Sequence, residues 1–115
     1  MRHGRLAALA SGAILVERVA WADTPGERLR GLLGRAPLAP GEGLLIAPCA
    51  SIHTCFMAYA IDAVYLDRDW RIIKIVPALA PWRLSGAIGA RMTLELAAYG
   101  ARALGLERGQ RLAWC

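Results

Sequence analysis

The 115-residue sequence predicts an α+β domain that is mainly β, with a small curled sheet or barrel-like core of six or seven short strands and two short helices. The apolar runs are short and rich in β-branched residues, which is typical of strands. These runs do not alternate with long helical patterns, so a doubly wound parallel sheet is not expected. The chain length fits a single domain over residues 1–115.

The strand candidates are spread along the chain. They cover residues 13–19, 44–47, 51–57, 61–66, 71–76, 92–96 and 111–114. A hairpin is expected to join the fourth and fifth of these through Asp67-Arg68-Asp69-Trp70, and residues 77–89 form the longest expected loop.

The first helix is predicted after Thr24, which has the form of an N-cap. Pro25 suits the first helical position and Glu27 completes a capping box. Leu29, Leu32 and Leu33 would form its buried face, and Gly34 is expected to end it. A second short helix is expected over residues 97–104, ended by Gly105.

Composition narrows the classes of partner and compartment. The net charge is +5, but the 13 Arg residues are scattered and form no basic stripe, so a nucleic-acid partner is not expected. The odd count of three Cys favours a reducing compartment over a disulfide framework, and we expect a cytoplasmic domain.

The N-terminus resembles a signal peptide, with basic residues 1–5, an apolar run over 6–16 and Ala20-Trp21-Ala22 as a cleavage-like site. Glu17 and Arg18 interrupt this pattern, so we interpret the region as a strand, with export left as the alternative. The run is shorter than the roughly 20 residues that span a bilayer, and no transmembrane segment is expected.

Candidate site residues gather in the polar segment Ser51-Ile52-His53-Thr54. Its donors and acceptors, with Met57 as an apolar wall and Trp82-Arg83 in the long loop as a closing element, favour a pocket for a small molecule or a peptide. Two other interpretations are a metal site of Cys49, His53 and Cys55, whose spacing is not that of a standard zinc knuckle, and a nucleophilic site. A fourth is structural: these polar groups would then only satisfy turns and backbone groups.

Two carboxylates complete the candidates. Asp62 would either serve His53 in a hydrolase or accept backbone N–H bonds. Glu95 stands alone among Leu94, Leu96 and Ala97, either as an acid with a raised pKa or, as we expect, paired with an Arg such as Arg91.

Several separated motifs resemble, in order, those of the family called domain of unknown function 192. They are Ala22-Asp23-Thr24, residues 27–33, residues 48–57, residues 61–67, Ile73 to Val76, Pro81-Trp82-Arg83 and Leu94-Glu95-Leu96. The resemblance implies a compact, mainly β domain with short helices, found in bacteria and archaea, and no established activity. The positions it marks as recurrent are Gly31, Ser51, His53, Met57, Asp62, Asp67 and Glu95.

The sequence departs from the family pattern at a few positions. The resemblance implies a basic residue or Asn near Ala58 and Gly where Trp70 and Tyr99 stand. Trp70 puts the tight-turn geometry in question, because Gly is the residue that accepts a positive φ without strain. Ala58 removes a cation that would hold an anionic ligand.

From these observations we expect a binding or accessory module rather than an enzyme, with no metal and no cofactor. Its ligand site would comprise Ser51, His53, Thr54, Met57, Asp62, Trp82, Arg83 and Glu95. The alternatives are a hydrolase that uses His53 with Asp62, and a protein–protein adaptor that exposes an apolar patch around Trp70 or Trp82.

Overall fold

The structure, a computed structural model, describes residues 1–115. It contains nine strands and two short helices, two more strands than the sequence predicts. In chain order these are β1 (Arg2–Ala8), β2 (Ile14–Ala22), α1 (Pro25–Arg30), β3 (Glu42–Ile46), β4 (Ser51–His53), β5 (Ile61–Leu66), β6 (Ile72–Leu79), β7 (Leu84–Gly86), β8 (Met92–Ala97), α2 (Gly100–Ala103) and β9 (Leu112–Trp114).

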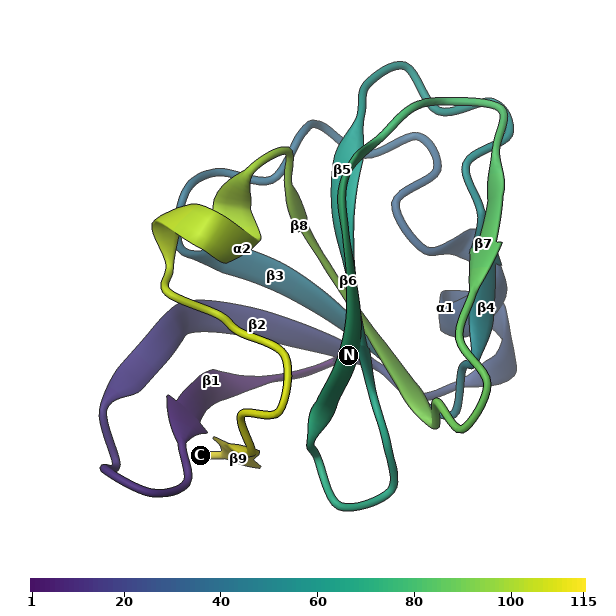
Figure 1. The fold of residues 1–115 in the computed structure, drawn as a ribbon. Coiled ribbons are helices and arrows are strands. Elements are labelled where there is room, and N and C mark those ends of the chain that lie inside the picture. Colours follow the sequence, from purple (N-terminus) through teal and green to yellow (C-terminus); the bar gives the residue numbers. More distant parts are fainter.

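Seven strands form one curled sheet in the order β6-β5-β8-β3-β2-β1-β9 (Figure 1). The β2–β3 pair is parallel and the other neighbouring pairs are antiparallel. The two edge strands approach each other at one end, where Arg71 and Arg111 form an isolated antiparallel bridge. The predicted mainly β class with a curled, barrel-like sheet is therefore confirmed.

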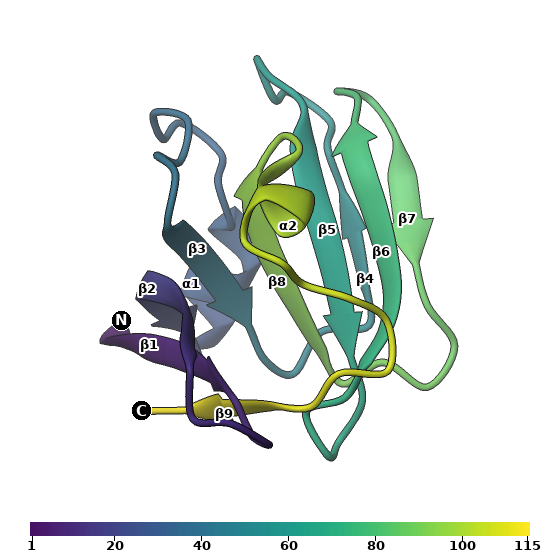
Figure 2. The ribbon, with the colours of Figure 1, turned by 60° about the vertical axis from the view of Figure 1, so that its left-hand side comes forward.

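The curl gives the sheet an inner and an outer face. Alternation along β8 sends Leu94 and Leu96 to the main core inside the curl, and Thr93 and Glu95 to the outer face. α2 lies near one end of the inner side, where Ala101 joins the main core (Figure 2). The outer face is covered by Leu32 and Leu33, which follow α1, and by a separate two-stranded ribbon of β4 and β7.

The N-terminal region forms two strands. The predicted strand at residues 13–19 is confirmed and extends to Ala22 as β2, whereas β1 was not predicted. β1 pairs with β2 on one side and with β9, from the far end of the chain, on the other. No helix has both the length and the apolar character that crossing a membrane requires.

The first helix starts as predicted but ends earlier. The Thr24 side chain accepts from the Glu27 backbone N–H, and Glu27 reaches back to Thr24, so the capping box is present. The helix ends at Gly31, with φ 52°, and not at Gly34. Leu29 was wrongly placed on the buried face: it is 79% exposed, because the early end of the helix leaves only Leu32 and Leu33 to pack inward.

The hairpin and the long loop also differ from expectation in detail. β5 and β6 form the predicted hairpin. Trp70 adopts φ 65° in its turn, and its ring makes a T-shaped contact with Trp21. β6 continues to Leu79, and the expected loop contains β7. Of the expected strand at residues 51–57, only Ser51–His53 is extended, because a turn begins after Thr54.

Candidate functional site

A cavity of about 180 Å³ lies between α1, the turn that follows it, and β4. The outer face of the sheet forms its floor through Ile46, Ile61 and Glu95, and Met57 forms part of its wall. Around it stand Arg28, Leu29, Arg30, Gly31, Leu32, Leu33, Cys49, Ser51, Ile52 and His53. Four of the eight predicted site residues, Ser51, His53, Met57 and Glu95, line the cavity, whereas Thr54, Asp62, Trp82 and Arg83 do not.

Glu95 is the unusual group of this cavity. Its residue surface is only 4% exposed, and its Oε2 atom is buried without a hydrogen-bond partner. Burial raises the pKa of this carboxyl from 4.5 to about 7, because water no longer stabilises the charged form. The expected pairing with Arg91 is wrong: the two ion pairs of the chain join other residues, Met1 with Glu27 and Arg2 with Asp23.

The position of Glu95 follows from the strand register. Glu95 lies opposite Ala63 on β5 and Leu44 on β3, in the middle of the sheet, where no long polar side chain reaches it from a neighbouring strand. Tyr59 and Tyr65 lie near enough for the charge of Glu95 to contribute to a raised pKa in each. Burial, and to a smaller degree Glu95, raises the pKa of Tyr59, whose hydroxyl donates to the Arg35 carbonyl at 3.1 Å.

β4 supplies the polar edge of the cavity. Ser51 and His53 are exposed, while Ile52 points between them into the packing against the sheet. The Ala87 N–H donates to the Ala50 carbonyl and the Thr54 N–H donates to the Arg83 carbonyl. Because bonding alternates along an antiparallel pair, the backbone groups of Ser51 and His53 point away from β7.

Thr54 has a structural role. It is fully buried; its hydroxyl donates to the Ala80 carbonyl at 2.6 Å and accepts from the Arg83 N–H at 2.9 Å. Its carbonyl accepts from the N–H groups of Met57 and Trp82. Thr54 therefore ties the turn after β4 to the loop before β7 and offers no free group to a ligand.

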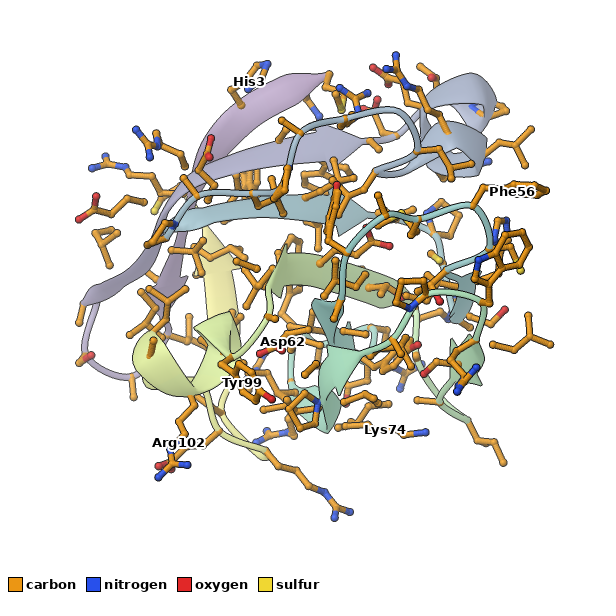
Figure 3. All side chains as sticks on the ribbon, turned by 90° about the horizontal axis from the view of Figure 1, so that it is seen from above. His3, Phe56, Asp62, Lys74, Tyr99 and Arg102 are labelled. Carbon is orange, nitrogen blue, oxygen red and sulfur yellow. The ribbon has the colours of Figure 1, made fainter.

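Asp62 also serves the fold. It lies on the inner side of the sheet, opposite to the face that carries Glu95, and Figure 3 shows it beside Tyr99. Its carboxylate accepts from the backbone N–H groups of Ala78 and Tyr99 at 2.8 Å and of Ala101 at 3.0 Å. This is the structural interpretation of Asp62, and it separates Asp62 from His53.

Trp82 and Arg83 do not close over the cavity. Trp82 is 58% exposed and its ring packs against Phe56, with centroids 4.7 Å apart. The Arg83 side chain is exposed and turns back toward the Trp82 carbonyl. No three His, Cys, Asp or Glu side chains gather as metal ligands, and the Cys49 thiol donates to the Ser51 carbonyl.

Sequence reasoning missed the contribution of α1 to the site. Arg28 and Arg30 border the cavity, and Gly31 turns the chain so that Leu32 and Leu33 form part of its wall. The capping box located the helix, and the resemblance marked Gly31 as recurrent. Neither showed that this helix packs across from β4.

The fold and the cavity together define a β-domain with a small pocket on the outer face of a curled sheet. The chain belongs to the DUF192 family, described as "Uncharacterized ACR", whose model matches residues 7–114.

Two solved structures share the fold. One, described as a putative transcription regulator from Sinorhizobium meliloti, is 24% identical, with a TM-score of 0.82 over 97% of this chain and 92% of that one. The other, a protein of unknown function from Novosphingobium aromaticivorans, is 21% identical, with a TM-score of 0.78 over 97% of this chain and 84% of that one. No curated protein matches.

Proposed function

We propose that this domain is a binding module whose cavity takes a small amine, either a free molecule or one side chain of a peptide, with Glu95 as the anchor. The observation that carries the proposal is the buried Oε2 atom of Glu95, which has no hydrogen-bond partner within the protein. A buried polar atom without a partner costs about 1–3 kcal/mol, so such atoms are rare in folded proteins. An N–H group of a ligand would supply the missing bond.

The surroundings of Glu95 favour a cationic donor. An ammonium group would stabilise the ionised carboxylate, which burial alone disfavours. The apolar floor and wall, formed by Ile46, Met57 and Ile61, would hold a short alkyl chain. Charge-assisted hydrogen bonds are about twice as strong as neutral ones, so an amine gains more here than an alcohol does.

The size of the cavity limits the ligand. About 180 Å³ is below the roughly 300–1,000 Å³ that is common for drug-sized ligands, so a few heavy atoms fill it. Arg28 and Arg30 border the cavity without a carboxylate partner. An anionic group on the outer end of the same ligand would therefore meet these two guanidinium groups.

Two alternatives to this proposal, another binding hollow and a hydrolase site, have less support. A wider hollow of about 420 Å³, bordered by Met1, His3 and Arg35, contains no buried polar atom that lacks a partner. A hydrolase that uses His53 with Asp62 has no support in the geometry, because Asp62 is bonded to backbone N–H groups on the other side of the sheet.

The test is a thermal-shift titration with n-butylammonium, guanidinium and the neutral control n-butanol. We expect n-butylammonium to raise the melting temperature of the wild-type protein and to have no effect on Glu95→Gln. Glu107→Gln removes an exposed carboxylate elsewhere and is the matched control, which should respond as the wild type does. Equal shifts by butylammonium and butanol, or an unchanged response of Glu95→Gln, would refute the proposal.

The pH dependence of binding has a defined sign. The free cavity holds Glu95 with a pKa of about 7, and an ammonium ligand lowers this pKa by favouring the ionised form. Amine affinity should therefore be full above pH 7 and fall about tenfold for each pH unit below it. An affinity that rises toward acid pH would contradict the role of the carboxylate.

A further inference from the structure

Large apolar side chains are exposed along the ribbon of β4 and β7 and its adjoining loops. Phe56 is 77% exposed, Trp82 58%, Leu84 83% and Ile88 104%. We call these four residues the apolar wing. None of them lines the Glu95 cavity, and Figure 3 shows Phe56 pointing outward at the edge of the molecule.

The exposure of the two aromatic rings is built into the backbone. Phe56 and Trp82 both adopt a positive φ, 65° and 63°, which is a strained conformation for a bulky residue. The buried Thr54 bonds to both of their loops and so holds the rings together at 4.7 Å. A solvent-facing aromatic pair whose residues both adopt a strained φ supports a contact surface rather than accidental exposure.

The charges around the wing are mainly positive. Residues 48–60 and 77–91, which carry the wing, contain no Asp or Glu, but include Arg83 and Arg91. Lys74 lies beside them, since its ammonium donates to the Gly86 carbonyl at 2.7 Å. Asp67 is the carboxylate that shares a hollow with Ile88, and Arg108 borders the same hollow.

We propose that the apolar wing inserts into the interface of a bilayer that contains anionic lipid. Trp, Phe, Leu and Ile with flanking cations are the side chains that such an interface accepts, the aromatic rings at headgroup level and the cations on the phosphates. The wing residues project into solvent, and each is more than half exposed. A second protein would fit better on a flat or hollow patch, so a lipid surface, which deforms around projecting side chains, is the occupant that the geometry favours.

The experiment is co-sedimentation of the full chain with two kinds of vesicle, phosphatidylcholine alone and phosphatidylcholine mixed with phosphatidylglycerol. We expect binding to the mixed vesicles, weakened by added salt. The double variant Phe56→Asn/Trp82→Asn should bind at least about tenfold more weakly, because it removes two apolar anchors while Asn tolerates a positive φ. Tyr99→Asn is the matched control, since Tyr99 is also exposed, aromatic and at φ 65°, but lies by α2. It should bind as the wild type does.

Several outcomes would overturn the proposal. One is wild-type protein that stays in the supernatant with both vesicles. Another is a double variant, shown to be folded by its circular dichroism, that binds as strongly as the wild type. A third is a wild-type dimer in size-exclusion chromatography that the double variant abolishes without any vesicle binding, since this would assign the wing to a second copy of the chain.

Discussion

Replacing Glu95 by Gln should stabilise the protein above neutral pH. The pKa of Glu95 is about 7 in the folded state and its ordinary value is 4.5. A pKa that is raised on folding contributes stability that is full below pH 4.5 and lost as the pH rises through 7. At about 1.4 kcal/mol for each pH unit, the wild type loses about 3 kcal/mol over this interval through Glu95.

The assay is urea unfolding, followed by circular dichroism, at pH values between 5 and 8. The wild-type free energy of unfolding should fall over this range, and that of Glu95→Gln should be nearly flat. For a domain of this size, about 3 kcal/mol corresponds to about 12 °C in melting temperature. Glu107→Gln, which changes an exposed carboxylate, should keep the wild-type slope. Parallel wild-type and Glu95→Gln curves would refute the reasoning, because Glu95 would then be ionised at no cost.

Four further substitutions test the placement of other groups by the same unfolding assay. Thr54→Val removes a hydroxyl that both donates and accepts, so it should lower the free energy of unfolding by about 2–3 kcal/mol. Thr93→Val loses one hydrogen bond to a carbonyl and should lower it by about 1 kcal/mol. Equal losses would contradict the role of Thr54 in joining the two loops. Asp62→Ala should cost at least about 3 kcal/mol because it leaves three backbone N–H groups without an acceptor, while amine binding to the folded variant should persist; selective loss of binding would place Asp62 in the site after all. Gly4→Ala should cost about 1–3 kcal/mol, since a Cβ there would lie 2.6 Å from the Trp114 ring; a neutral effect would show that β1 and β9 are not packed as described.

Local signals predicted the local parts of the fold. The start of α1 follows from Thr24 and Glu27, whose mutual hydrogen bonds depend only on residues within one turn. The β5–β6 hairpin likewise follows from two short apolar runs joined by a polar turn. β1 was missed because its second partner, β9, is at the other end of the chain, and no pattern within residues 2–8 records that pairing.

The candidate site was predictable in part for the same reason. The polar segment of β4 was visible as residues 51–54, and His53 and Ser51 do border the cavity. Glu95 lacks a partner because the register of β8 between β3 and β5 sets the face of the sheet that its side chain occupies. Sequence patterns do not reveal this register. Asp62 also carries a carboxylate and lies on the strand next to that of Glu95. Its side chain points to the opposite face of the sheet, where it accepts from three backbone N–H groups instead of lining the cavity.

The pairing of β9 with β1 joins a strand near residue 113 to the first strand that is synthesised. Arg5 and Cys115 exchange backbone hydrogen bonds at 2.9 Å in both directions. A growing chain therefore keeps this edge of β1 unsatisfied until residues 112–115 have left the ribosome, so the sheet is completed late. During that interval the open edge is available to other nascent strands, and chaperone dependence during expression would be the observable result.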